Sequence, residues 1–342
     1  MTPDWKTVVR RFYRHDRLTA GFFFLILIFF LVCHAFAEDR QIKIGIAPWI
    51  SNEESDKNIA AFKKRLELVG FIEGKNTVYY QENAQANPDK QAKIIQSFVE
   101  KKVDLIYSLT APGTLIAGKI TQDIPIVFSN IVFPVEVGIV KSLSSSENNC
   151  VGTRNYISVG KQLEALLMIV PDIRRLGVVH LTADPNSTVQ LEQMTEIGKA
   201  LGIQIVDMNA PNLDTLKELL QTVNADALYL ACDALVQDGG EDIVIEKALK
   251  DKIPTLSCYS SGIRKGALVG DIVNLVELGT ASGKKAVAIL NGEKPTDIIT
   301  ETQQGSYVMV NLKTVDALGL PKPYQVLAIA SDRKSTRLNS SH

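Results

Sequence analysis

Short apolar runs rich in β-branched residues alternate with amphipathic segments in the first half of the chain. Over 53–69 the apolar residues Ile59, Phe62 and Leu66 recur at helical spacing and share one face. A helix is likewise expected to begin at Asn87-Pro88, because proline is favoured at the first helical position. The pattern predicts strands over 41–47, 78–80, 104–108 and 125–128, and further helices over 112–120 and 135–143.

A polar stretch at 144–149 interrupts this pattern, and the alternation then resumes in the second half of the chain. Strands are predicted over 176–180, 203–206, 227–230, 255–257 and 267–269, and helices over 161–170, 187–201, 213–223, 243–249 and 277–290. Strands that alternate with helices predict a parallel sheet covered by helices on both faces. The fold class is therefore α/β, with two doubly wound parallel-sheet lobes that meet near residue 150.

Both ends of the chain differ from this alternation. Five Lys and Arg residues within 1–17 precede an almost wholly apolar run over 18–37, which closes with Ala35-Phe36-Ala37. These features predict a secretory signal peptide over 1–37, cleaved after Ala37. A retained membrane anchor is the alternative, because the run is long enough to span a bilayer. Residues 332–342 are polar and without periodicity, and we interpret them as a non-native tail.

The charge of the chain narrows the choice of partners. Its 342 residues include 37 Lys and Arg against 38 Asp and Glu, a net charge of −1. This balance argues against a nucleic-acid partner, which would favour a basic excess. Residues 38–331 alone carry 29 basic and 35 acidic residues, and His180 is their only histidine. That part of the chain is thus acidic and poor in the residue most used for catalysis.

Motifs for catalysis are absent from the sequence. It contains no phosphate-binding G-x-x-x-x-G-K-[ST], no G-x-G-x-x-G after the first strand, no H-E-x-x-H and no G-x-S-x-G. A Ser-His-Asp or Cys-His site would have to use His180, and a metal site built on histidine would be equally limited. We therefore expect no enzyme, no cofactor and no metal; an exported hydrolase that uses carboxylates alone is the alternative.

Three cysteines remain after the signal segment. Cys232 and Cys258 each follow a predicted strand of the second half, so their sulfur atoms could be close if those strands are neighbours. An exported protein occupies a compartment where disulfides persist. Two buried thiols are the alternative, and Cys150 is unpaired in either case.

Polar and aromatic residues follow the predicted strands, at the edge where such sheets bind ligands. Thr110 and Ala111 open a helix whose N–H groups could receive a carboxylate, Trp49 could stack on an aromatic group, and Asp233 could pair with an ammonium. A plain helix cap, a packing Trp and a surface Asp are the structural alternatives. The predicted ligand-binding residues are Trp49, Thr110, Ala111, Asn130, Asn186, Ser187, Asp233, Ser260 and Asp271.

Six segments, taken in order, resemble the tryptophan/tyrosine-type substrate-binding proteins of ABC transporters over nearly all of 42–320. They are LVGFIEGKN at 68–76, DIPIVF at 123–128, VKSL at 140–143, KQLE at 161–164, KGAL at 265–268 and VNLKT at 310–314. In this resemblance Thr110-Ala111-Pro112 matches a Thr-Pro-type turn of the family at the cleft. However, Ala47-Pro48-Trp49 and Cys232-Asp233-Ala234 replace more polar triplets, so a more apolar pocket is expected.

The resemblance implies a type I periplasmic-binding-protein fold with a three-segment hinge. Lobe 1 would contain 41–153 and 276–298, and lobe 2 would contain 154–275 and 299–330. The expected function is that of a periplasmic, monomeric receptor for an ABC importer. It would bind a small solute, such as an amino acid or an aromatic or apolar compound, and deliver it to a membrane permease with its ATPase. A sensor module that reports to a membrane signalling partner is the alternative, because the same fold serves both.

Overall fold

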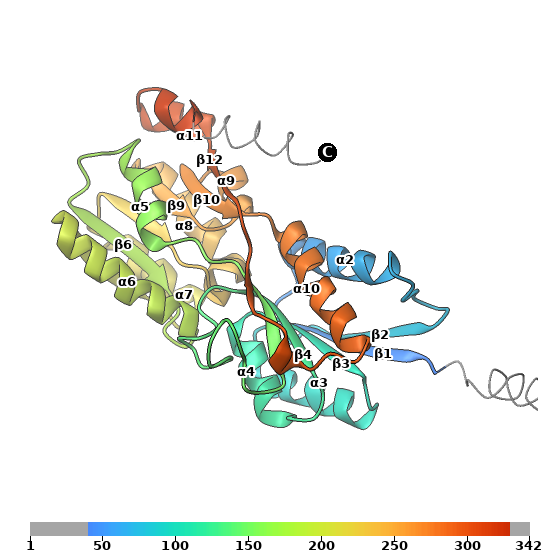
Figure 1. The fold of residues 1–342 in the computed structure, drawn as a ribbon. Coiled ribbons are helices and arrows are strands. Elements are labelled where there is room, and N and C mark those ends of the chain that lie inside the picture. Colours follow the sequence, from blue (N-terminus) through green and yellow to red (C-terminus); the bar gives the residue numbers. More distant parts are fainter. Residues whose placement is uncertain (1–39, 329–342) are drawn as a thin grey trace, which may run out of the picture.

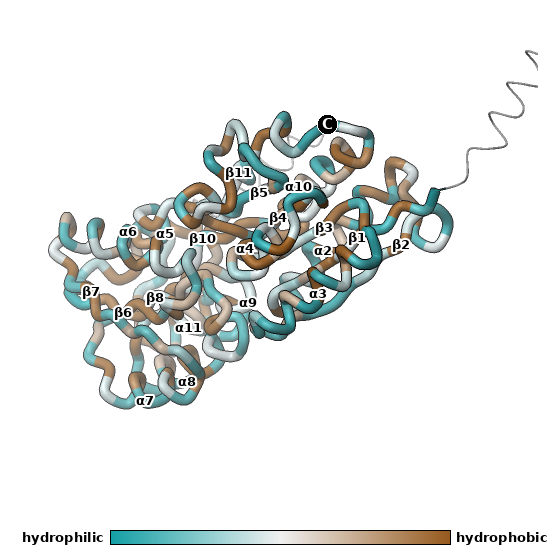
Figure 2. Tube along the Cα trace, turned by 90° about the horizontal axis from the view of Figure 1, so that it is seen from below, coloured by the Kyte–Doolittle hydropathy of each residue, from teal (hydrophilic) through white to brown (hydrophobic). Residues whose placement is uncertain are grey.

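A computed structural model describes residues 40–328, which form two six-stranded sheets covered by helices (Figure 1). The predicted signal peptide and the predicted non-native tail lie outside these residues. Within 40–328 no helix combines the length and the apolar character that a membrane crossing requires. In Figure 2 the hydrophobic residues follow the strands at the centre of each half, whereas the connecting loops are mainly hydrophilic.

The first sheet has the strand order β11-β5-β4-β3-β1-β2, and all its pairs are parallel. Helices α2 and α10 pack on one of its faces, and α3 and α4 pack on the other. The strands are Ile42–Pro48 (β1), Thr77–Gln81 (β2), Leu105–Leu109 (β3), Ile126–Ile131 (β4), Cys150–Arg154 (β5) and Glu301–Thr302 (β11). The helices are Glu53–Glu67 (α2), Pro88–Glu100 (α3), Ala111–Ile120 (α4) and Leu275–Leu290 (α10).

The second sheet has the order β12-β10-β9-β8-β6-β7, and β12 runs antiparallel to β10 at its edge. Its strands are Arg175–His180 (β6), Gln204–Asn209 (β7), Ala227–Leu230 (β8), Thr255–Ser257 (β9), Val269–Val273 (β10) and Ser306–Val310 (β12). Its helices are Val159–Leu167 (α5), Pro185–Leu201 (α6), Leu213–Gln221 (α7), Glu241–Asp251 (α8), Ser260–Lys265 (α9) and Leu312–Leu318 (α11). Two short turns of helix complete the fold, Val236–Gly240 (η1) and Pro295–Asp297 (η2).

We define each sheet with its helices as one lobe. The chain passes between the two sheets three times, after β5, after β10 and after β11 (Figure 1). Because β11 pairs with β5, residues 301–302 lie in the first sheet, although the sequence-based division begins the last lobe 2 segment at 299. The carboxyl ends of β1, β3 and β4 in lobe 1 and of β6, β8 and β9 in lobe 2 meet between the lobes, which is where a hinged protein binds its ligand.

One predicted helix was wrong. The segment 135–143 forms turns rather than a helix: Gly138 adopts a φ of +76°, and the amides of Ile139 and Val140 both donate to the carbonyl of Pro134. A backbone that turns back in this way cannot continue helical hydrogen bonding. The strands β5, β11 and β12 and the helices α9 and α11 lie in segments for which no such element was predicted.

Candidate functional site

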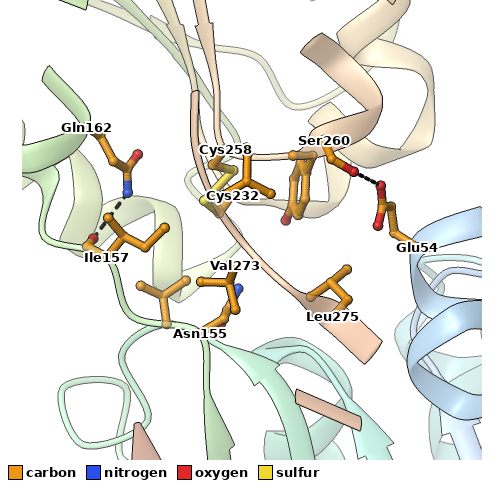
Figure 3. A pocket seen from close by; sticks show the side chains of 12 residues that line it. Glu54, Asn155, Ile157, Gln162, Cys232, Cys258, Ser260, Val273 and Leu275 are labelled. Carbon is orange, nitrogen blue, oxygen red and sulfur yellow. Dashed lines mark hydrogen bonds between the residues drawn. A yellow bond between two sulfur atoms is a disulfide. The ribbon is translucent and has the colours of Figure 1, made fainter. Parts of the chain in front are cut away.

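A cavity lies between the two lobes, at the carboxyl ends of β8 and β9 and beside the crossing segments (Figure 3). Most of its walls are apolar, and a few polar groups converge on it, as a small-molecule site requires. The residues that line it are Glu54, Val132, Asn155, Ile157, Gln162, Cys232, Cys258, Tyr259, Ser260, Ile272, Val273 and Leu275.

Hydrogen bonds hold the two lobes together around this cavity. Glu54 of α2 reaches across to lobe 2, where it accepts hydrogen bonds from the hydroxyl of Ser260 and, at 3.0 Å, from the guanidinium of Arg264 (Figure 3). The side chain of Asn52 donates to Gln237 at 3.3 Å. Elsewhere between the lobes, the amide of Phe133 donates to the side-chain oxygen of Asn186 at 3.2 Å. The structure therefore represents a closed arrangement of the lobes.

A buried polar network fixes the lobe 2 wall of the cavity. The Tyr229 hydroxyl donates to Gln162 Oε1 at 2.9 Å and accepts from Gln190 at 3.0 Å. The side-chain oxygen of Gln190 accepts a hydrogen bond of 2.9 Å from the backbone amide of Cys232. Gln162 also donates to the carbonyl of Ile157 at 3.1 Å (Figure 3). Because every member has partners inside the protein, this wall is organised before any ligand binds.

A disulfide joins Cys232 and Cys258, whose Cα atoms are 5.9 Å apart. This distance lies within the usual range for disulfides. The sequence left the pairing open, and the structure joins the two residues because β8 and β9 are neighbouring parallel strands. Cys150 is free and buried in lobe 1, and burial raises the pKa of its thiol to about 12. The bonded pair faces the cavity, so it forms part of the wall that a ligand would contact.

The predicted site residues of lobe 1 gather at the carboxyl ends of adjacent strands. Trp49 follows β1 and is buried in a cluster that also contains Ala234 of lobe 2. Thr110 and Ala111 follow β3, and Asn130 at the end of β4 accepts a hydrogen bond of 2.8 Å from Asn155. The indole nitrogen of Trp49 and the hydroxyl of Thr110 are buried and have no hydrogen-bond partner among the described residues. Buried polar groups normally have a hydrogen-bond partner, and these two groups lack one within the described part of the chain.

Three of the predicted residues of lobe 2 form hydrogen bonds at the lobe interface. The oxygen of Asn186 accepts from lobe 1, and the hydroxyl of Ser187 donates to the carbonyl of Leu181 at 2.6 Å. The Asp233 carboxylate accepts from the amides of Leu181 and Val236 at 2.7 and 3.0 Å. These bonds bind the β6 and β8 loops together at the lobe interface, as a turn-forming Asp does.

The last two predicted residues lie in different places. Ser260 lines the cavity and contacts Glu54. Asp271 lies in the middle of β10, paired with Val308 of β12, and lines a separate hollow with Lys161 and Ala165 of α5. The structure therefore brings Ser260 to the cavity and places Asp271 elsewhere on lobe 2.

Two buried carboxylates lie close together beneath the lobe interface. Asp184 caps α6 by accepting a hydrogen bond of 3.0 Å from the amide of Asn186. Burial raises the pKa of Asp184 to about 7, and the negative charge of Asp233 adds to the shift. Burial also raises the pKa of Asp233 to about 6, although its bonds to backbone amides oppose the change. The Asp184 carboxyl is therefore partly neutral near pH 7, whereas the Asp233 carboxyl is mainly charged.

Sequence reasoning missed Glu54, Asn155 and Tyr259. Glu54 lies in the first turn of α2, the helix that follows β1, so the rule that ligands bind at strand ends could have included it. The capping box between Asn52 and Ser55 fixes the start of that helix and was readable as a local pattern. Asn155 lies in a crossing segment, and no local signal marks its position.

Thr110 has a strained backbone, with φ +71° and ψ 159°, a region that only glycine occupies readily. We expect Thr110→Gly to raise the free energy of unfolding by about 1 kcal/mol, because relief of strain outweighs the added flexibility of the unfolded chain. Urea unfolding measures the change. Thr110→Ala is the matched control, since it keeps the Cβ atom and therefore the strain. An equal gain in both variants would contradict the expectation.

Two α/β lobes, a three-segment connection and a cavity between them define the class of two-lobed extracytoplasmic binding proteins. The chain belongs to the family of ABC transporter substrate binding proteins, whose pattern matches residues 43–334. The expected fold class, transport function and family are thereby confirmed. The family consists of solute-binding proteins rather than enzymes.

Comparisons with individual proteins agree with this assignment. The chain is 30% identical over 288 residues to a tyrosine-binding protein of Clostridioides difficile, an alignment that covers 83% of this chain and 82% of that protein. It is also similar to the ligand-free, open structure of a substrate binding protein with adhesive properties from Clostridium difficile (32% identity, TM-score 0.65, 82% and 96% of the two chains). A structure from Streptococcus pneumonia in complex with L-Trp has the same fold (21% identity, TM-score 0.80, 85% and 98%).

Proposed function

We propose that this chain binds an aromatic amino acid in the cavity between its lobes and delivers it to a membrane permease driven by an ATPase. The observation that carries the proposal is the lining of the cavity, in which the ring of Tyr259 and the side chains of Ile157, Val273 and Leu275 surround a few polar groups. Apolar walls favour an aromatic side chain, and the polar groups orient it. The tyrosine-binding relative supports the same ligand class.

Transport requires that the ligand control the closure of the lobes. A ligand shifts the balance between open and closed forms only by its differential affinity for them. The contacts of Glu54 with Ser260 and Arg264 exist only when the lobes meet, so a ligand enclosed beside them would favour the closed form. The closed form would then present one composite surface to the permease, with the protein acting as a monomer.

Export supplies the compartment for this function. We propose that residues 1–37 direct the chain out of the cytoplasm and are removed after Ala37, which leaves a periplasmic protein. N-terminal sequencing of exported protein tests this: a chain that begins at Glu38 supports it. A chain that retains the apolar run of 18–37 would indicate an anchored protein and would favour the sensor alternative.

We expect L-tyrosine or L-tryptophan to stabilise the purified protein against thermal unfolding. At a ligand concentration about 100 times the Kd, the stabilisation should be about 2.7 kcal/mol, because only the folded state binds. Differential scanning fluorimetry across the amino acids gives the ranking, and isothermal titration calorimetry gives the Kd. Glycine is the matched negative control, since it has the same charged groups and no side chain. An unchanged Tm with every aromatic amino acid would contradict the proposal.

A further inference from the structure

The disulfide between Cys232 and Cys258 lies at the start of two segments that contact lobe 1. We call residues 232–240, which follow β8 and include η1, the β8 arm, and residues 258–265, which follow β9 and include α9, the β9 arm. Figure 3 shows the bonded cysteines at the cavity, between Gln162 and Ser260. The bond is therefore a part of the cavity wall and a covalent link between the two arms.

Both arms contact the start of the same lobe 1 helix. In the β8 arm, Gln237 accepts a hydrogen bond of 3.3 Å from Asn52, the residue that caps α2. In the β9 arm, Ser260 and Arg264 both donate to Glu54, which lies in the first turn of α2. These contacts join the lobes, so the spacing of the two arms decides whether both can reach α2 together.

The disulfide holds the arms together where the sheet no longer does so. The parallel pairing of β8 and β9 ends at Leu230 and Ser257, just before the two cysteines. Beyond the disulfide the arms are joined by side-chain hydrogen bonds, such as the one that the amide of Gln237 donates to the hydroxyl of Tyr259. Single hydrogen bonds of this kind contribute little net stability compared with a covalent link. Opening the disulfide should therefore loosen the contacts of both arms with lobe 1.

We propose that the Cys232–Cys258 disulfide is a redox control of ligand binding, and that only the oxidised protein holds both arms in the arrangement that closes over the ligand. The inference rests on the proposed function, because it concerns the closure of the same cavity around an aromatic amino acid. The two redox states differ in how readily the lobes close, and closure sets the affinity for an enclosed ligand.

A dithiol supplies the reduction. One of its thiolates attacks a sulfur of the disulfide, which forms a mixed disulfide and releases the other cysteine as a thiolate. The second thiolate of the reagent then attacks the reagent's own sulfur in the mixed disulfide and releases the remaining cysteine. The reagent leaves as a cyclic disulfide, and the protein gains two electrons and two protons as a pair of thiols.

Ligand binding and redox state are then linked in both directions. If reduction weakens ligand binding by a given factor, the bound ligand favours the disulfide over the two thiols by the same factor. A 10-fold difference in affinity corresponds to a shift of about 30 mV in the reduction potential of this two-electron couple. A protein loaded with ligand should therefore resist reduction by a dithiol better than the free protein.

Isothermal titration calorimetry with L-tyrosine and L-tryptophan compares the oxidised protein with the same protein in excess dithiothreitol. We expect reduction to raise the Kd by about 10-fold while the far-UV circular dichroism spectrum stays that of a folded protein. Cys150→Ala should respond to the reductant in the same way, since this cysteine is free. Equal Kd values in the two redox states would overturn the proposal. Unfolding of the reduced protein would also overturn it, because the bond would then serve folding rather than closure.

A double variant tests whether the disulfide acts through the arms. Gln237→Ala with Arg264→Ala removes a lobe 1 contact from each arm, and neither residue lines the cavity. In this variant reduction should change the Kd by about 3-fold or less, because the contacts that reduction loosens are already missing. Lys265→Ala is the matched control: Lys265 lies in the β9 arm but pairs with Asp242 of lobe 2, so the full response should remain. A full response in the double variant would show that the arms do not transmit the effect.

Small-angle X-ray scattering of the ligand-free protein separates this inference from the function on which it rests. We expect dithiothreitol to increase the radius of gyration, because the reduced arms hold the lobes together less well. If neither aromatic amino acid binds but the radius still increases, the ligand class is wrong and the redox control of closure stands. If both bind equally in the two redox states, the redox control is wrong and the ligand class stands. If neither binds and the radius is unchanged, both are wrong.

Discussion

Replacing Cys232 and Cys258 together by serine is expected to lower the free energy of unfolding by about 3.5 kcal/mol. The disulfide closes a loop across a sequence separation of 26 residues, and opening it restores conformational freedom to the unfolded chain. The effect should be concentrated in lobe 2, because the bond links the ends of β8 and β9 there. Urea unfolding followed by far-UV circular dichroism measures the loss.

The reduced protein provides an independent version of the same experiment. Unaltered protein unfolded in the presence of a phosphine reductant should lose about as much stability as the double variant, and the double variant should not respond to the reductant. Cys150→Ala is the matched control, since this cysteine is free and its removal should leave the response to the reductant intact. Equal midpoints for oxidised protein and the double variant would contradict the expected contribution of the bond.

The order of strands and helices could be predicted from sequence because most elements carry their own pattern. Helix α2 shows this, since Ile59, Phe62 and Leu66 are spaced for one face and pack on the first sheet. The strand β5 shows the limit. Its sequence CVGTR has little apolar character, and it is a buried strand because β4 and β11 pair with it from distant parts of the chain. Pairing of that kind leaves no local signal.

The edge that carries the site could be predicted, but the contacts across it could not. Reasoning from strand ends found Ser260 and the turn at Thr110, because parallel strands place their carboxyl ends along one edge. It could not foresee that Glu54 would bond to Ser260 and Arg264, since these residues meet only through the closure of the lobes. It also gave Asp233 a ligand role, which stays a prediction; in the structure each of its oxygens accepts a hydrogen bond from a backbone amide.

The carboxylates of Asp184 and Asp233 give the folded protein a pH dependence with a definite sign. The pKa of Asp184 lies near 7 in the folded protein against an ordinary value of 3.8, chiefly because burial disfavours the charged form. The folded state therefore binds more protons than the unfolded state between about pH 4 and pH 7. The stability that the neutral Asp184 carboxyl contributes is fully present below that window and is lost as the pH rises through it.

The substitution Asp184→Asn should remove much of the loss of stability that the unaltered protein shows as the pH rises. The asparagine oxygen can still accept the hydrogen bond from the amide of Asn186, but the side chain never becomes charged. Relative to the unaltered protein, the variant should gain stability between pH 5 and pH 8, on the order of 4 kcal/mol if the whole shift acts on folding. Urea unfolding at several pH values gives the two curves.

Asp214→Asn is the matched control for this experiment. Its carboxylate is 87% exposed and paired with Lys217, so removing its charge should shift stability slightly and leave the pH profile unchanged. If the free energy of unfolding changes with pH in the same way for Asp184→Asn and the unaltered protein, Asp184 does not titrate in this window. A steeper loss in the variant would mean that the charged carboxylate stabilises the lobe interface, the reverse of what its burial implies.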